Sequence, residues 1–180
     1  IIEADESDGS VVQYHPEIGL LLNIDKDHQE IDELIELFSI FKSNTNSLFI
    51  VNQSNALAKS LSTNSKNDFG FVDNNAGYSA ENFKQDGLSL NFEVLNQKFQ
   101  MNSLGQHSVE NATAAIAVAN QIGIDLKTCA DSLASYEGIY RRHQILGQKN
   151  GVWVIDDYAH NPAKWAASIK ACQPLAEKVI

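Results

Sequence analysis

The sequence predicts an α/β protein: a mostly parallel sheet with crossover helices plus a small antiparallel section. Three observations support this class. Apolar runs at 18–24 and 48–51 alternate with helical patterns at 29–42 and 56–61, an order typical of parallel strands joined by crossover helices. Between 62 and 103, Asn, Ser, Gly and Asp separate short apolar runs, which favours antiparallel strands and turns. Long helical patterns then return.

Each element of the first part has a local reason. A short strand is predicted at 1–5, where two isoleucines lead into acids, and a second at 18–24, where Leu and Ile dominate. At 29–42, apolar side chains recur at i, i+3, i+4 and i+7, and acids gather in the first half, where the helix dipole favours negative charge. A strand at 48–51 and a short helix at 56–61 complete the alternation.

The middle of the chain predicts three antiparallel strands, at 68–72, 88–94 and 98–101, with a hairpin turn at 95–97. An Ala-rich helix is predicted at 105–119, because small side chains allow a helix to pack closely on a sheet.

A further helix, 125–135, follows the stop signal at Gly123, and a polar connection covers 136–144. A buried strand at 151–155 then runs into a helix that begins near Pro162, since the β-branched and aromatic run stops abruptly at two acids.

Composition excludes several classes of protein. The net charge is −10 and the 13 Lys and Arg residues are too few for a nucleic-acid binder. No apolar run approaches the roughly 20 residues of a membrane span. Cys129 and Cys172 lack the spacing of a zinc site, so free thiols in a reducing, cytoplasmic setting are expected. The chain opens without Met in what is predicted to be mid-strand, and we expect it to be an excerpt of a longer protein.

The most informative stretch follows the predicted strand 151–155. Asp156, Asp157, Tyr158, His160 and Asn161 place acids, a phenol, an imidazole and an amide where α/β sheets hold their ligands. The simpler alternative is that the two acids cap the next helix and His160 is an ordinary loop residue.

Three further groups of candidates lie elsewhere. Glu3 and His28 follow the first two predicted strands, where a carboxylate and an imidazole suit one cation; alternatively, they are a solvated acid and a helix-start residue. His107 and Asn111 share one face at a helix N-terminus. Residues 141 and 142 are the only two arginines of the chain, and such a pair suits the binding of an anion. The alternative is that both side chains are simply solvated at the surface.

Five ordered motifs together resemble the Mur ligase family, and most of all its members that add L-alanine. The motifs are Glu3–Ser10, Asn23-Ile24 with Asp27-His28, Gly105–Ala112, Gly138 with Arg141-Arg142, and Asp156–Pro162. The resemblance implies an ATP-dependent ligase of peptidoglycan precursor synthesis that joins an amino acid to UDP-N-acetylmuramate through an acyl phosphate. L-alanine is the leading candidate for that amino acid. It also implies that 1–142 belong to a central ATP-binding domain and 143–180 begin a Rossmann-like C-terminal domain.

The resemblance also implies roles for single residues. Glu3 and His28 would bind the Mg²⁺ that bridges the ATP phosphates. Arg142, together with Arg141, would meet the terminal phosphate, and Asp157 would lie near the ribose or phosphate end of the nucleotide.

At the other end of the nucleotide, His107 and Asn111 would approach the adenine. Tyr158 and His160 would border the incoming amino acid and the acyl intermediate. His28, Arg142 and His160 would thus form the catalytic set.

The chain departs from the family pattern in four places. The Gly-rich phosphate loop with Lys and Ser or Thr is absent, and we expect it to precede Ile1. Ser108 stands where an Asn usually follows the His, and Asn161 where L-alanine-adding members have a second His. No lysine after His28 matches the carbamylated lysine of some members.

Three alternatives therefore stay open. The first is a sister ligase that adds another amino acid or a peptide. The second is a metal-dependent hydrolase built on Glu3, His28 and Asp157, and the third is a non-catalytic relative that keeps only the fold and nucleotide binding.

Overall fold

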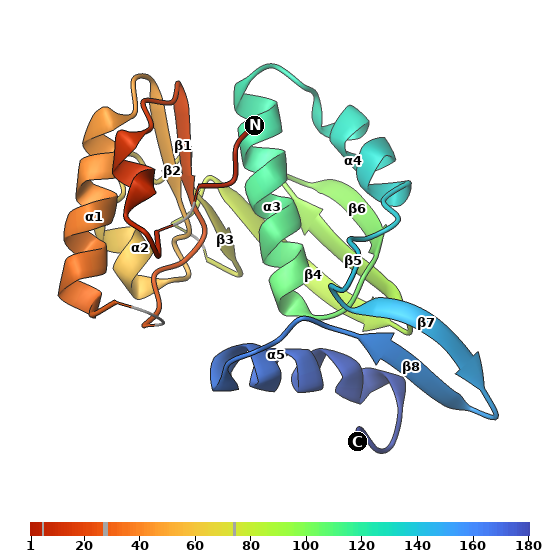
Figure 1. Cartoon of the computed structure of the whole chain (residues 1–180). Helices are drawn as coiled ribbons and strands as arrows, with labels where there is room; N and C mark the ends of the chain where they lie inside the picture. Colours follow the sequence, from red (N-terminus) through yellow and green to blue (C-terminus); the bar gives the residue numbers. More distant parts are fainter. Residues whose placement is uncertain (5, 27–28, 74) are drawn as a thin grey trace. The chain divides into compact units, whose positions relative to one another are not determined.

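The computed structural model describes residues 1–4, 6–26, 29–73 and 75–180 (Figure 1). They form two compact units. Unit 1 comprises residues 1–79 and 113–123, and unit 2 comprises 80–112 and 124–180. Helices, parallel strands and antiparallel strands all occur, which confirms the predicted α/β class.

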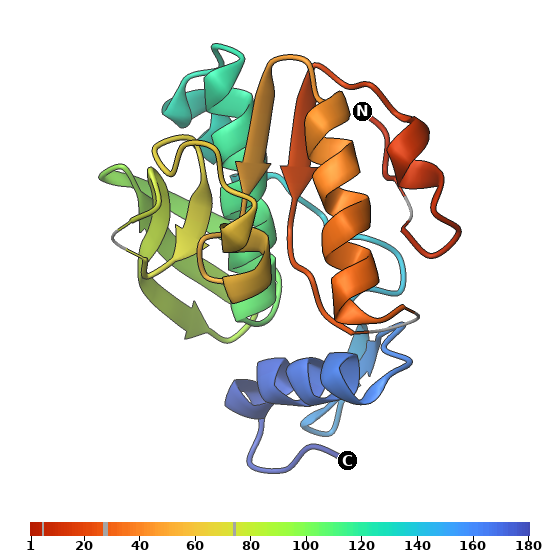
Figure 2. The same ribbon diagram turned by 90° about the vertical axis from the view of Figure 1, so that its left-hand side faces the viewer.

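Unit 1 contains the parallel part of the fold. Strands β1 (Ile18–Leu21) and β2 (Leu48–Val51) pair in parallel and are joined by helix α1 (Ile31–Asn44), which lies beside them (Figure 2). At the start of α1, the Glu30 and Glu33 side chains each accept a hydrogen bond from the other's backbone N–H, a capping box. The helical periodicity of 29–42 predicted α1 because its buried positions, Leu34, Phe38 and Phe41, lie on one face.

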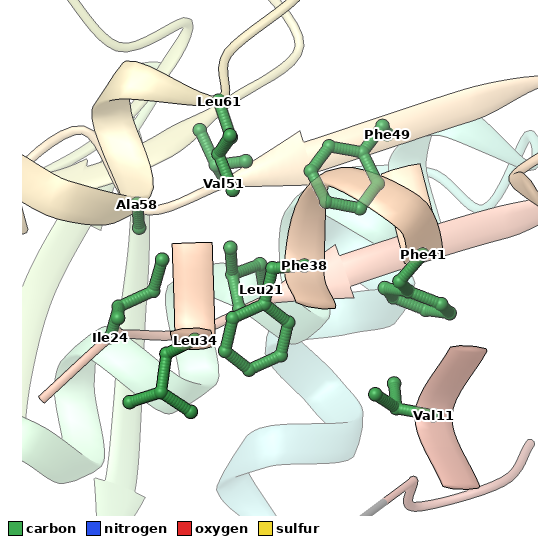
Figure 3. Packing of buried hydrophobic residues seen from close by; sticks show 10 residues of the cluster. All are labelled: Val11, Leu21, Ile24, Leu34, Phe38, Phe41, Phe49, Val51, Ala58 and Leu61. Atoms are coloured by element: carbon green, nitrogen blue, oxygen red, sulfur yellow. The ribbon is translucent and has the colours of Figure 1, made fainter. Parts of the chain in front are cut away.

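That face of α1 packs into a hydrophobic core with both strands (Figure 3). The rings of Phe41 and Phe49 meet edge to face with centroids 5.9 Å apart. Loops and the short helices η1 (Ser10–Gln13) and α2 (Ala56–Ser60) contribute further residues. The whole cluster consists of Val11, Leu21, Ile24, Leu34, Phe38, Phe41, Phe49, Val51, Ala58 and Leu61.

A buried acid links β2 with strand β3 (Phe69–Phe71) in unit 1. Asp68 is fully buried, and its carboxylate accepts hydrogen bonds from the Val51 N–H (2.9 Å), the Gln53 side-chain amide (2.6 Å) and the Ser62 hydroxyl. Three donors replace the water that the carboxylate loses on burial, so Asp68 fixes the chain around the end of β2.

The antiparallel sheet has the strand order β3-β4-β5-β6, and the boundary between the units falls within β4 (Tyr78–Asp86). Strands β5 (Ser89–Val94) and β6 (Gln97–Asn102) form a hairpin in which Phe92 stacks on Phe99. Leu95 and Asn96 both have positive φ, as a two-residue hairpin turn requires. The predicted turn at 95–97 is confirmed.

Helices return after the antiparallel strands, as predicted. Helix α3 (Gln106–Gln121) begins in unit 2 and ends in unit 1, and α4 (Leu126–Ala134) lies against β6. Strands β7 (Gln144–Lys149) and β8 (Val152–Asp156) form an antiparallel hairpin. Helix α5 (Pro162–Cys172) follows, capped by the Asn161 side chain, and η2 (Gln173–Leu175) ends the regular structure.

Some sequence expectations were wrong. Residues 1–4 form no strand, because a strand needs a hydrogen-bonded partner and β1 pairs only with β2 among the described residues. Strand 151–155 exists as β8 but is not buried: the side chains of Val152 and Val154 are more than half exposed. The polar strands β4 and β7 were not predicted. The proposed domain boundary after residue 142 stays a prediction.

Replacing Asp68 by Ala is expected to lower the free energy of unfolding by about 3 kcal/mol, because three donors lose a charged acceptor in a buried place. Guanidinium unfolding of the protein measures the change. The matched control is Asp131→Ala on α4, where the carboxylate is 68% exposed and an effect within about 0.5 kcal/mol is expected. Equal losses for the two variants would contradict a structural role for Asp68.

Candidate functional site

Polar side chains from three segments of unit 2 meet in one cluster. His107 comes from the first turn of α3. The second segment is the arginine turn, residues 139–143, which precedes β7. The third is the β8–α5 loop, residues 157–161. All three segments belong to the same compact unit.

The start of α3 is fixed by a close approach of α5. Gly105 has a φ of +78°, and a Cβ at this position would lie 2.6 Å from the Cβ of Ala171 and 2.9 Å from the His107 ring. Only glycine suits both constraints. The Gln85 side chain accepts from the Gly105 N–H (3.1 Å) and donates to the Ala171 carbonyl oxygen (3.1 Å). These contacts hold His107 in a defined place.

His107 belongs to a half-buried row with His143 and Asp157. The imidazole rings of His107 and His143 have centroids 5.0 Å apart and are tilted by 32°. Nδ1 of His143 lies 3.4 Å from Oδ2 of Asp157, and the two side chains are only 7% and 17% exposed. A carboxylate beside an imidazole nitrogen selects the tautomer that carries the proton on that nitrogen.

Burial of the imidazole lowers the pKa of His107, and the nearby His143 lowers it further, while the negative charge of Asp157 opposes both effects. His107 is therefore favoured as the neutral form near pH 7. Burial also raises the pKa of the Cys172 thiol, with a smaller contribution from Asp157, so Cys172 stays a protonated, unreactive thiol.

Asp157 joins the β8–α5 loop to the arginine turn. Oδ2 accepts from the backbone N–H of His143 (2.9 Å), and Oδ1 accepts from the backbone N–H of Ala159 (3.0 Å). The Tyr158 N–H donates to the Arg141 carbonyl oxygen (2.9 Å) beside this link. Arg141 and His143 both have positive φ, +58° and +47°, a conformation that costs about 1 kcal/mol or more for residues other than glycine.

Two guanidinium groups gather around the Tyr158 ring. The Cζ atoms of Arg141 and Arg142 lie 5.1 and 5.9 Å from the ring centroid, within cation–π range. Nε of Arg141 also lies 3.6 Å from a carboxylate oxygen of Asp156. Both arginines are exposed, so an anion can reach them without moving the backbone.

His160 lies edge-on to Tyr158, with ring centroids 5.3 Å apart. Its Nδ1 is 3.0 Å from the Tyr158 carbonyl oxygen, and its Nε2 is 3.1 Å from the Lys164 ammonium. Because an ammonium group can only donate, Nε2 accepts from Lys164 and Nδ1 carries the proton. Nε2 of His160 is thus an exposed proton acceptor.

The structure brings together six of the residues that the sequence pointed to: His107, Arg141, Arg142, Asp157, Tyr158 and His160. Asn111 is exposed on α3, one turn after His107, and no hydrogen bond among the described residues joins it to this cluster. Glu3 is exposed in unit 1, and His28 lies outside the described residues.

Sequence reasoning missed His143, Gln85 and Lys164. The four-residue spacing of His160 and Lys164, ahead of a helix, was a usable signal. His143 and Gln85 gave none, because their roles depend on segments distant in the sequence.

Within the described ranges, no group of three or more His, Cys, Asp or Glu side chains is placed to hold a metal ion. Because His28 is not among those residues, the predicted magnesium site at Glu3 and His28 stays a prediction. In the same part of the chain, no helix combines the length and the apolar character that crossing a bilayer requires.

Residues 1–119 match the Mur ligase middle domain. The chain belongs to the Mur ligase family. This confirms the family that the five ordered motifs indicated.

Two relatives that are similar to this chain in sequence are named as ligases. UDP-N-acetylmuramate–L-alanine ligase from Synechocystis sp. is 32% identical over 96% of this chain and 36% of that protein. The enzyme of the same name from Thermosynechococcus vestitus is 34% identical over 96% of the chain and 38% of its own length. The chain thus spans little more than a third of these relatives.

Solved structures share the fold. UDP-N-acetylmuramate-alanine ligase from Thermotoga maritima superimposes with a TM-score of 0.83 at 24% identity, covering 97% of this chain and 42% of its own. MurF from Acinetobacter baumannii superimposes with a TM-score of 0.78 at 23% identity, covering 93% and 39%. Both place the described chain in a shared Mur ligase architecture.

Replacing His107 by Gln is expected to weaken the pH dependence of stability. Because the pKa of His107 is lowered in the folded protein, the unfolded chain binds more protons as the pH falls through about 6.5. The stability contributed by neutral His107 is present above that pH and is lost as the pH falls toward the folded-state pKa.

Urea unfolding at pH 7.5 and pH 5.5 measures this difference. The drop in stability on acidification should be smaller for His107→Gln than for the wild type. His15→Gln, at an exposed histidine of unit 1, is the control and should keep the wild-type drop. An unchanged drop in His107→Gln would contradict the burial argument.

Proposed function

We propose that this chain forms part of a cytoplasmic, ATP-dependent ligase of peptidoglycan precursor synthesis, which joins L-alanine to UDP-N-acetylmuramate. The observation that supports it most is the exposed arginine pair, held by Asp157 against Tyr158 and His160 in a chain of the Mur ligase family. Relatives named for this reaction match nearly the whole chain.

The arrangement suits a reaction in which negative charge accumulates. When the carboxylate of the sugar substrate meets the terminal phosphate of ATP, their negative charges must be offset before they can react. Arg142, with Arg141 beside it, supplies two permanent positive charges that match phosphate oxygens in a fork. Glu3 and His28 would bind Mg²⁺, which would supply positive charge toward phosphate oxygens.

We assign the adenine end of the nucleotide to helix α3. His107 is neutral near pH 7, so its imidazole can both donate to and accept from the nitrogens of an adenine base. Asn111, exposed on α3 one turn further on, adds an amide with the same dual capacity. Asp157 contributes by holding the arginine turn, since both of its oxygens already accept backbone N–H groups.

The amide-forming step requires a free amine. The incoming amino acid arrives as an ammonium group and must lose a proton before it attacks the acyl phosphate. Nε2 of His160 accepts from the Lys164 ammonium, and the substrate ammonium can take the place of Lys164 as donor. Tyr158, next to His160, would then line the binding site of the amino acid. The products are the amide, ADP and phosphate.

A sister ligase is the second candidate function. Asn161 replaces a histidine of the L-alanine-adding pattern, and here its side chain caps α5 by accepting from the Lys164 N–H (2.9 Å). This favours a change in the amino acid or peptide that is added. By contrast, the hydrolase alternative gains no support, because the carboxylate of Asp157 is engaged by two backbone donors.

The deciding experiment uses the full-length protein with ATP and UDP-N-acetylmuramate, together with L-alanine, glycine, L-serine or a dipeptide. ADP release and the mass of the UDP-linked product are measured. We expect ADP release that requires both the sugar acid and L-alanine, with one amide formed for each ADP. Amide formation with another amine identifies a sister ligase, and no amide with any of them identifies a non-catalytic relative.

Arg142→Lys is expected to lower kcat by about 100-fold, because a lysine cannot hold two phosphate oxygens in a fork as charge develops. Steady-state rates of ADP release measure the effect. Lys149→Gln, at an exposed cation of β7, is the matched control and should keep the wild-type rate. A wild-type kcat in Arg142→Lys would remove Arg142 from the phosphate site.

A further inference from the structure

The side chain of His143 is more buried than that of its partner Asp157, and the proposed reaction gives it no task. It directly follows Arg142, at the end of the arginine turn, and its side chain is only 7% exposed. Its φ is +47°, so the backbone adopts a left-handed conformation there without a glycine. A strained, buried histidine next to a predicted phosphate ligand calls for a physical reason.

Asp157 holds both the backbone and the ring of His143. Oδ2 of Asp157 accepts from the His143 backbone N–H at 2.9 Å and lies 3.4 Å from Nδ1 of the same residue. The other oxygen, Oδ1, accepts from the Ala159 N–H, so the carboxylate cannot rotate without losing a bond. The ring of His107 covers the imidazole at a centroid distance of 5.0 Å.

The second ring nitrogen of His143 has an unfavourable environment. Nε2 is buried and has no hydrogen-bond partner among the described residues. A buried polar atom without a partner costs stability, and a phenylalanine would fill a similar space without that cost. Packing alone therefore does not account for an imidazole here, whereas the contact between Nδ1 and Asp157 does.

We propose that His143 is a positioning residue, which acts through Asp157 to hold the arginine turn in the conformation that presents Arg142 to the phosphate. This inference rests on the proposed ligase function. The two positive φ angles flank Arg142, and the turn keeps them only while Asp157 and the Tyr158 N–H hold its backbone. If Nδ1 is removed, Oδ2 of Asp157 keeps only its hydrogen bond from the His143 backbone N–H and loses its contact with the ring. The arginine turn then relaxes.

The test compares His143→Phe, which keeps a ring of similar shape, with His143→Asn, whose side-chain amide replaces the Nδ1–H donor. In the full-length protein, we expect His143→Phe to lower kcat about tenfold while its Tm stays equal or rises. His143→Asn should keep kcat within about threefold of the wild type. His15→Phe, at an exposed histidine, should change neither quantity.

Two outcomes of this comparison would overturn the proposal. One is a wild-type kcat in His143→Phe. The other is a loss of kcat that is accompanied by a loss of Tm and that His143→Asn does not restore, because this would mark a purely structural side chain.

A double variant tests whether His143 acts through Asp157. If it does, His143→Phe combined with Asp157→Asn should be no slower than Asp157→Asn alone. Losses of kcat that multiply would show two independent roles and overturn the proposed path.

A measurement without turnover separates this inference from the proposed function. The ¹⁵N shifts of the His143 imidazole should show the proton on Nδ1 in the wild type and a mixture of tautomers in Asp157→Asn. If the wild type forms no amide while the Nδ1–H tautomer is present, the proposed function fails and the contact between His143 and Asp157 stands. If amide forms and the proton lies on Nε2, the positioning role of His143 alone fails.

Discussion

The arrangement of the polar cluster in unit 2 depends on the hydrogen bonds that the Asp157 carboxylate accepts. It accepts one hydrogen bond from each of two segments, at His143 and at Ala159, and so joins the arginine turn to the β8–α5 loop. The arginines, Tyr158 and His160 all lie on these two segments. The relative placement of the charged and aromatic groups therefore follows from one partly buried acid whose oxygens are both engaged.

Asp68 shows the same physical solution in a different role. It too is an acid surrounded by neutral donors, but it is fully buried and its partners are Val51, Gln53 and Ser62. None of these three partners is charged. Asp157 keeps 17% of its side chain exposed and lies beside two exposed arginines, so the same kind of bonding organises a surface that ligands can reach.

The elements that the sequence predicted well have strong local patterns. Helix α1 and strand β2 follow from apolar periodicity, and the β5–β6 hairpin follows from an alternating pattern around Leu95-Asn96. Strands β4 and β7 are polar, and pairing with a neighbouring strand overrides their weak propensity. Within the site, the arginines and Asp157 could be predicted from their residue types and positions in the sequence. His143 could not, because its role depends on contacts with His107 and Asp157, which are distant in the sequence.

Strain in the arginine turn has a functional logic. A glycine at position 141 or 143 would adopt positive φ at no cost, but it would also leave the turn free to sample many conformations. Non-glycine residues at both positions restrict the backbone, and the bonds from Asp157 and Tyr158 offset the strain. A pre-formed turn loses less conformational entropy when it binds an anion, so more of the electrostatic attraction appears as binding. On this argument, the positive φ angles at Arg141 and His143 are part of how the chain presents its two arginines.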